Sequence, residues 1–264
     1  MSIHPSALIE TDKVPADLQA GPFCVVEADV LLADGIRLAA HSIVRSGSQL
    51  QTGVQVDSFA VVGGGPQSLS FDPSTTSGVK VGSATILREG VTIHRATREN
   101  GFTAVGVNCL LMSNAHVAHD CEIGDSVTLA NNAMLGGHVQ IGNKAFIGGG
   151  AGIHQFVRIG ELAMIAGNAS VSADVPPYIM VAERNMACGL NLIGLRRAGM
   201  DADTIADLKR CYRAVFFGGG NPVTKAKTAL ESGSIGQSQQ GKAFLTFFLE
   251  GKRGFVRSSN GKSD

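Results

Sequence analysis

Large aliphatic residues recur at every sixth position over most of this chain, a period that belongs neither to a helix nor to an ordinary strand. A first run spans 8–62. In a second run, twelve successive positions six apart are all Val, Ile or Leu: Val105, Leu111, Val117, Ile123, Leu129, Leu135, Ile141, Ile147, Ile153, Ile159, Ile165 and Val171. A column of smaller residues, mostly Ala, Cys and Val, stands four positions after the large ones. Each hexad therefore predicts a strand too short to bury its apolar residue alone, so hexads must stack.

Glycine follows the large residue at intervals of eighteen, at Gly106, Gly124, Gly142 and Gly160. This spacing predicts that three hexads complete one coil of a triangular prism with three parallel sheets, the coils about 4.8 Å apart. The pattern resembles the hexapeptide-repeat family, whose fold is an all-β left-handed parallel β-helix. The left hand is implied by that resemblance and not by the spacing.

Two polar interruptions are expected to leave the prism as loops at about 63–80 and 94–104. The six-residue period stops after Val175, at Pro176 and Pro177, and from about residue 191 the pattern becomes helical. We expect helices from about Met200 to Val215, from Pro222 to Ser232 and around 244–249. The predicted domains are a β-helix over 1–190 and a C-terminal α-helical domain over 191–264 that packs on the prism.

Composition narrows the classes of function. The 22 basic and 22 acidic residues cancel, which disfavours a nucleic-acid or polybasic membrane surface. No stretch of 18 apolar residues exists, and the N-terminus lacks the pattern of a signal peptide, so we expect a cytoplasmic protein without integral membrane insertion. The five scattered cysteines predict neither disulfides nor a zinc ribbon.

Eighteen residues per coil place His119, Gly137 and Gln155 in one outer column and Asp120, His138 and Phe156 in the next. His119 must point outward, because the inward columns are occupied by other residues. An imidazole beside a carboxylate, with a glycine backbone on the next coil, suits a general base and an oxyanion donor.

Two other interpretations of the histidines remain open on spacing alone. An outward histidine is often an ordinary surface residue. The fold class also includes γ-type carbonic anhydrases, zinc hydratases that space two histidine ligands five residues apart on one coil, whereas His116 and His119 are three apart. We expect no metal. A β-helix that serves only to oligomerise is the non-enzymatic alternative.

The segments NAHVAHDC, LGGHV, IHQF, DVPPY and NLIGLRR, with GPF near residue 21 and VTIHR at 91, resemble the acyl-ACP:UDP-N-acetylglucosamine O-acyltransferases of lipid A biosynthesis over essentially the whole chain. The resemblance implies a homotrimer with sites between prisms, acyl carrier protein (ACP) as co-substrate carrier, and no cofactor. It implies His119 as base, Asp120 as its support and Gly137 as oxyanion donor. The implied substrate contacts are His116, His138, His154, Gln155, Asn191 and Arg197, and Gly167 would end the acyl pocket and favour a long 3-hydroxyacyl chain.

The chain departs from the family in the first loop. Ser68 and Ser70 stand where an Asp and a Lys are usual, and Ile193 and Ala198 replace an acidic residue and a second Arg near the helical tail. Ser68 and Ser70 are retained as candidate substrate contacts. Because some relatives acylate a 3-amino sugar, an amide-forming reaction on the 3-amino analogue of UDP-GlcNAc remains the main alternative.

Overall fold

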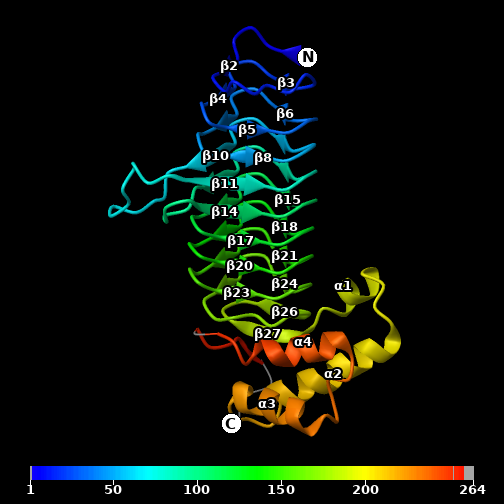
Figure 1. Ribbon diagram of the computed structural model, residues 1–264. Coiled ribbons are helices and arrows are strands. Elements are labelled where there is room, and N and C mark those ends of the chain that lie inside the picture. The colour runs from blue at the N-terminus through cyan, green and yellow to red at the C-terminus, as the bar shows by residue number, and fades with distance from the viewer. Residues whose placement is uncertain (1, 252, 259–264) are drawn as a thin grey trace.

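The structure is a computed structural model that describes residues 2–251 and 253–258. Three parallel sheets form a long prism, with a helical domain at its C-terminal end (Figure 1). Within the described residues, sheet A has twelve strands: β1 (Ser2–Ile3), β3 (Gln19–Ala20), β6 (Arg37–Leu38), β9 (Gln55–Val56), β12 (Ile86–Leu87), β15 (Leu110–Leu111), β18 (Thr128–Leu129), β21 (Phe146–Ile147), β24 (Met164–Ile165), β26 (Ile179–Ala182), β27 (Met186–Leu190) and β28 (Arg257–Ser258).

The other two sheets complete the triangle. In the part of the chain described, sheet B has nine strands: β2 (Leu8–Ile9), β4 (Val25–Val26), β7 (Ile43–Val44), β10 (Val61–Gly64), β13 (Thr92–His94), β16 (His116–Val117), β19 (Met134–Leu135), β22 (Gly152–Ile153) and β25 (Ser170–Val171). Sheet C has seven over the same residues: β5 (Leu31–Leu32), β8 (Gln49–Leu50), β11 (Ser77–Val81), β14 (Gly101–Val105), β17 (Glu122–Ile123), β20 (Gln140–Ile141) and β23 (Arg158–Ile159).

The eighteen-residue coil predicted from the spacing is confirmed by the strand pairing. His116 pairs with Met134, and Glu122 pairs with Gln140, each eighteen residues later. The predicted inward columns are buried: Val117 and Ala133 have no exposed surface, and Leu135 has 1%. Every large inward residue therefore rests on its counterparts in the coils above and below, which is how strands of two residues are stabilised.

Most corners of the prism turn through a residue with positive φ, a left-handed conformation that favours Gly, Asn and Asp. At the corner between sheets B and C, this position is occupied by Asp120, His138 and Phe156, with φ of 58°, 60° and 66°. A ring at such a position is unusual, and the regular ladder on both sides must hold it there.

Both loops are shorter than the sequence predicts. β11 and β14 pair with each other over five residues, from Ser77 and Gly101 onward, so the first loop covers 65–76 and the second 95–100. Polar residues interrupt the hydrophobic pattern in these two strands, so the pattern did not predict their full length. The loops lengthen the coil locally: Val61 pairs with Thr92, 31 residues later, and Thr92 pairs with His116 after 24. The first loop projects from the side of the prism (Figure 1).

The C-terminal part begins with a feature that the six-residue period does not predict, an antiparallel pairing of β26 with β27. Four helices follow within the described residues: α1 (Leu192–Arg197), α2 (Ala202–Phe216), α3 (Pro222–Ser232) and α4 (Gln239–Phe247). Polar side chains cap their N-termini, and the positive φ of Gly233 ends α3. The expected helices are thus present, with α1 in addition.

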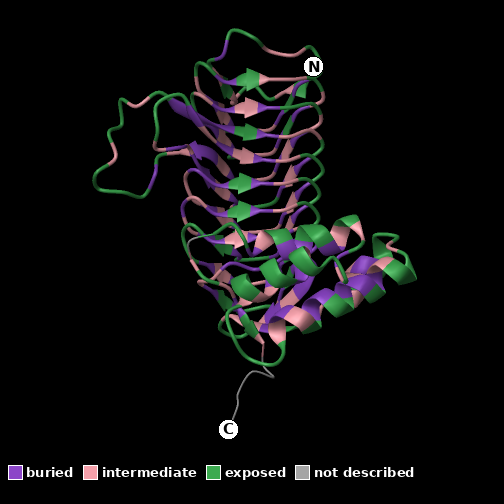
Figure 2. Ribbon diagram, turned by 60° about the horizontal axis from the view of Figure 1, so that its bottom comes forward, coloured by how far each residue is buried: buried purple, intermediate pink, exposed green. Residues whose placement is uncertain are grey.

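The helical domain contacts the last coils of the prism, and its own core includes aromatic rings from α2 and α4. Arg158 of β23 makes an ion pair with buried Asp174 at 2.9 Å, donates to backbone carbonyls at the end of α4, and lies over the ring of Phe247. Figure 2 shows buried and exposed residues alternating along the helices. The helices therefore close the C-terminal end of the β-helix. In the described part of the chain, no helix is long and apolar enough to cross a membrane.

Candidate active site

His119 and Asp120 lie in the turn between β16 and β17, at the corner of sheets B and C. His119 Nδ1 is 2.8 Å from Asp120 Oδ2, and the side chains are 21% and 3% exposed. Burial acts to raise the pKa of Asp120, but hydrogen bonds from Thr97 and His119 outweigh it, so the pKa lies below its ordinary value. The ionised carboxylate accepts from Nδ1–H, which leaves the Nε2 lone pair of the neutral imidazole free to take a proton.

Gly137 lies one coil above His119, as the spacing predicts. A Cβ atom at Gly137 would stand 2.6 Å from His119 Cε1 and 2.8 Å from Nε2, so only glycine fits against the ring in this position. Among the residues that the structure describes, the backbone N–H of Gly137 meets no acceptor. A free N–H beside the basic nitrogen is the arrangement that oxyanion stabilisation needs.

His138 links the His119–Asp120 pair to the next coil. Its Nε2 lies 3.9 Å from Asp120 Oδ2, its ring meets His119 edge-on at 5.2 Å, and it stacks on Phe156 at 4.6 Å. Desolvation lowers the pKa of His138, with Asp120 opposing and His119 and Arg98 adding to the shift. The lowered pKa favours the neutral form of this ring, which suits contact with an uncharged sugar hydroxyl.

His94 is a buried histidine beside the site that sequence analysis did not single out. It ends β13, lies edge-on against His116 at 4.8 Å, and its Nδ1 has no hydrogen-bond partner among the described residues. Desolvation, reinforced by His116 and His119, lowers the pKa of His94 to about 4. Its place in VTIHR, just before the second loop, was the available signal.

The low pKa of His94 predicts a pH-dependent stability. In the unfolded chain His94 protonates near its ordinary value of about 6.5, and in the folded chain only near 4, so stability is complete above 6.5 and is lost as the pH falls between these values. At pH 5 the loss is about 2 kcal/mol relative to pH 7. Urea unfolding at both pH values should show that His94→Gln removes this part of the pH dependence. An unchanged dependence would mean that the imidazole is protonated in the native protein.

His116, His154 and Gln155 occupy the same corner and its edges. His116 Nδ1 shares a hydrogen bond of 2.7 Å with Thr92 Oγ1, and burial lowers its pKa. His154 and Gln155 are exposed one coil further on, and His154 Nδ1 is 3.1 Å from an Arg253 nitrogen. Their contact with a ligand beside His119 and Gly137 stays a prediction.

Four predicted residues lie elsewhere in the chain. Ser68 and Ser70 are exposed in the first loop, where their hydroxyls are 3.0 Å apart. Arg197 is exposed in the last turn of α1. Gly167 lies in the turn between β24 and β25, at the corner of sheets A and B, so one chain does not bring it to His119.

Asn191 stands at the start of the helical tail, where the family resemblance implies a uridine contact, and that contact stays a prediction. Asn191 is 7% exposed, its Oδ1 accepts from the Gly194 N–H as the cap of α1, and its Nδ2 donates to the Leu162 carbonyl. The side chain therefore caps α1 and holds this helix on the prism, and a polar residue directly before the helix was the sequence signal for the cap.

One group in the described residues has the composition of a metal site. Ligand atoms of His119, Asp120 and His138 lie within 4.8 Å of one another. The imidazole and carboxylate of this group are hydrogen-bonded to each other at 2.8 Å. That is the arrangement of a general base with its supporting acid, so the geometry favours base chemistry over ligation.

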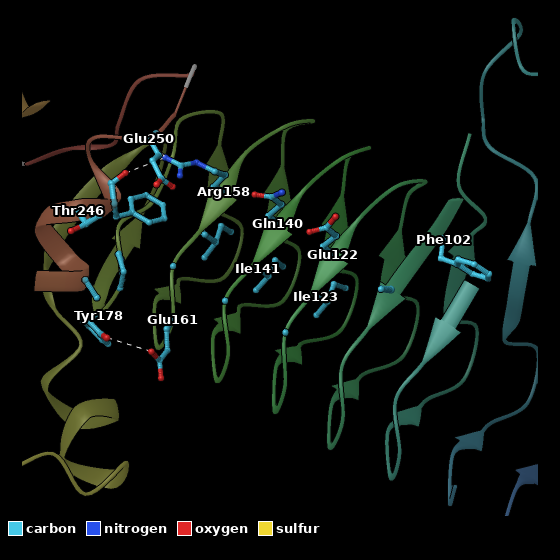
Figure 3. A pocket seen from close by; sticks show the side chains of 18 residues that line it. Phe102, Glu122, Ile123, Gln140, Ile141, Arg158, Glu161, Tyr178, Thr246 and Glu250 are labelled. Atoms are coloured by element: carbon cyan, nitrogen blue, oxygen red, sulfur yellow. Dashed lines mark hydrogen bonds between the residues drawn. The ribbon is translucent and has the colours of Figure 1, made fainter. Parts of the chain in front are cut away.

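A hollow lies on the outer face of sheet C, against α4 (Figure 3). Glu122, Gln140 and Arg158 project into it from successive strands, and Tyr178 and Thr246 stand at its far end. None of the predicted site residues lines it. The histidine corner is therefore a separate feature.

A parallel β-helix that presents an imidazole–carboxylate pair beside a free backbone N–H defines the class of hexapeptide-repeat acyltransferases. The comparisons agree with this class. Residues 103–137 match the model of the bacterial transferase hexapeptide repeat, and residues 174–256 match the second domain of UDP N-acetylglucosamine O-acyltransferase.

Whole-chain relatives narrow the class to one family. The chain is 40% identical over 222 residues to the acyl-[acyl-carrier-protein]–UDP-N-acetylglucosamine O-acyltransferase of Rhizobium johnstonii. The match covers 83% of this chain and 81% of the relative. The UDP-N-acetylglucosamine acyltransferase structure from Campylobacter jejuni has a TM-score of 0.90 at 35% identity, over 97% of this chain and 99% of that one. The one from Francisella novicida has a TM-score of 0.88 at 31% identity, over 98% and 93%.

The chain belongs to the acyl-ACP–UDP-N-acetylglucosamine O-acyltransferase family. The family resemblance and the left-handed β-helical fold with C-terminal helices, both predicted from the sequence, are confirmed.

Proposed function

We propose that this protein transfers a 3-hydroxyacyl chain from acyl carrier protein to the 3-position of UDP-N-acetylglucosamine, the first step of lipid A biosynthesis, in the cytoplasm. The observation that carries the proposal is the pairing of His119 with Asp120 directly beneath the unpaired N–H of Gly137. The family to which the chain belongs supports the choice of substrates.

The geometry gives each group one task. His119 Nε2 takes the proton of the sugar 3-hydroxyl as its oxygen attacks the thioester carbonyl. The Gly137 N–H stabilises the oxyanion of the tetrahedral intermediate, and Asp120 stabilises the imidazolium. Collapse of the intermediate breaks the carbon–sulfur bond, and the imidazolium returns its proton to the leaving thiolate. The products are the acylated sugar nucleotide and ACP with a free thiol. This reaction requires no metal, cofactor or covalent acyl-enzyme.

A second copy of the chain completes the site in this proposal. His119 and Gly167 lie on different corners of one prism, and a homotrimer would bring the corner of sheets B and C against the corner of sheets A and B of a neighbour. Gly167 leaves its surroundings open, because an added Cβ would meet only the Gly149 carbonyl, at 3.3 Å. An open position at this height suits a long acyl chain.

The first loop favours a second acceptor within the same mechanism. Ser68 and Ser70 are uncharged, exposed and hydrogen-bonded to each other, where family members usually present an Asp and a Lys. A site without this charged pair suits the 3-amino analogue of UDP-GlcNAc, which would yield an amide. His119 would then take the proton from the attacking nitrogen.

Mass spectrometry of the product distinguishes these acceptors. The purified protein is incubated with UDP-GlcNAc or its 3-amino analogue and a panel of 3-hydroxyacyl carrier proteins of different chain length. We expect one product, an ester or an amide, and a higher rate with long chains than with short ones. Absence of acyl transfer with every pair would contradict the proposed function, and a preference for short chains would contradict the role of Gly167.

A further inference from the structure

The carboxylate of Asp120 is held through a single oxygen. Its Oδ2 accepts three hydrogen bonds: from the Thr97 N–H at 3.0 Å, the Thr97 hydroxyl at 2.7 Å and His119 Nδ1 at 2.8 Å. Its Oδ1 is buried and has no hydrogen-bond partner among the described residues. Thr97 therefore supplies two of the three hydrogen bonds that stabilise this buried charge.

We propose that Thr97 is a positioning residue of the acyl transfer, which fixes the Asp120 carboxylate and, through it, the His119 imidazole. The inference rests on the proposed function of the site. Thr97 acts through Asp120 and needs no contact with either substrate.

The physical reason lies in the burial of Asp120, whose side chain is 3% exposed. A buried carboxylate is stable only when its hydrogen bonds are made, and bonds to a charged group are roughly twice as strong as neutral ones. Without the Thr97 hydroxyl, only the Thr97 N–H and His119 hold the carboxylate, so it is less firmly fixed and so is the imidazole bonded to it. A base displaced from its line of attack loses much of its effect.

The second loop brings Thr97 to the carboxylate and is itself attached to the first loop. The Arg95 guanidinium donates to the carbonyls of Pro73 and Thr75, each at 2.8 Å, and Glu99 accepts from the Thr76 N–H at 2.9 Å. Thr97 lies between these two anchors. The loop that carries the predicted acceptor contacts is thus connected to the His119–Asp120 pair through the backbone of the second loop and its hydrogen bonds at both ends.

The first test compares Thr97→Val, which removes the hydroxyl while keeping the shape, with Thr97→Ser, which keeps the hydroxyl. We expect Thr97→Val to lower kcat about tenfold with little change in KM, corresponding to one charge-assisted hydrogen bond, and Thr97→Ser to retain most of the activity. Equal loss in both variants, or a change in KM alone, would overturn the proposal.

The control is Thr204→Val at the start of α2. There too a threonine donates both its N–H and its hydroxyl to one aspartate, Asp201, at 2.7 and 2.9 Å. The donors and the acceptor group are of the same kind, but this pair is exposed, uses both carboxylate oxygens and caps a helix outside the site. This variant should keep the wild-type kcat.

A double-mutant cycle separates positioning from a general loss of structure. In an Asp120→Ala background, Thr97→Val should cause no further loss of kcat, because its target is gone. Additive losses would show that Thr97 acts on the fold and not through Asp120. An inactive wild type would contradict the proposed function instead, so the two failures are distinguishable.

Discussion

The variant His119→Ala should lose about a thousandfold in kcat/KM, within the range that a positioned general base contributes. The loss follows from the free Nε2: without it, the acceptor hydroxyl must be deprotonated by water during its attack on the thioester. The imidazole faces outward and is 21% exposed, so its removal opens no cavity in the prism. The rate should be measured with saturating acyl-ACP, and the unfolding temperature should match that of the wild type.

His4→Ala is the matched control for this prediction. His4 is exposed and, like His119, is hydrogen-bonded through Nδ1, to Ser6 at 2.8 Å, but it lies in the first coil at the far end of the prism. It should leave kcat/KM unchanged. If His119→Ala kept most of its acyl transfer, the proton would have to be taken by another group and the mechanism would be wrong.

Gly137→Ala is the second large effect that we expect. The added methyl group would stand 2.6 Å from the His119 ring, which Asp120 holds on its other side. The ring must move by several tenths of an ångström, and a displacement approaching 1 Å costs about a hundredfold in rate. The backbone N–H remains, so kcat should fall through misplacement of the base while the fold persists.

Gly124→Ala controls for crowding between coils. A Cβ atom there would stand 2.4 Å from Asn143 Oδ1 and 2.9 Å from the Asn143 nitrogen, a clash of similar severity at a different corner. This variant should lower the unfolding temperature yet keep kcat in the protein that folds. Normal kcat for Gly137→Ala would show that the ring has room to move and that its position is not critical.

The parts of this structure that repeat could be predicted from the sequence, because each coil must bury apolar residues at the same positions. The inward columns and the eighteen-residue register follow from Val, Leu and Ile at fixed spacing, and the register places Gly137 against His119 without further information. The roles of these residues and the domain boundaries stay predictions. The left hand required the family resemblance.

The parts that break the repeat could not be predicted. Thr97 and His94 reach the site because the second loop lengthens its coil to 24 residues, and no periodic pattern states where an inserted segment returns. The antiparallel strands β26 and β27 follow Pro176 and Pro177, where the six-residue period ends and no longer predicts strands.

The constant rise per coil fixes the axial distance between any two positions on the prism. Gly167 stands 48 residues beyond His119, which at eighteen residues per coil is an axial distance of about 13 Å for strands 4.8 Å apart. A threefold axis parallel to the prism would preserve this height between neighbouring subunits. The backbone would then set the accepted acyl-chain length in steps of one coil, and only side chains at the corners could adjust that length by less than one coil.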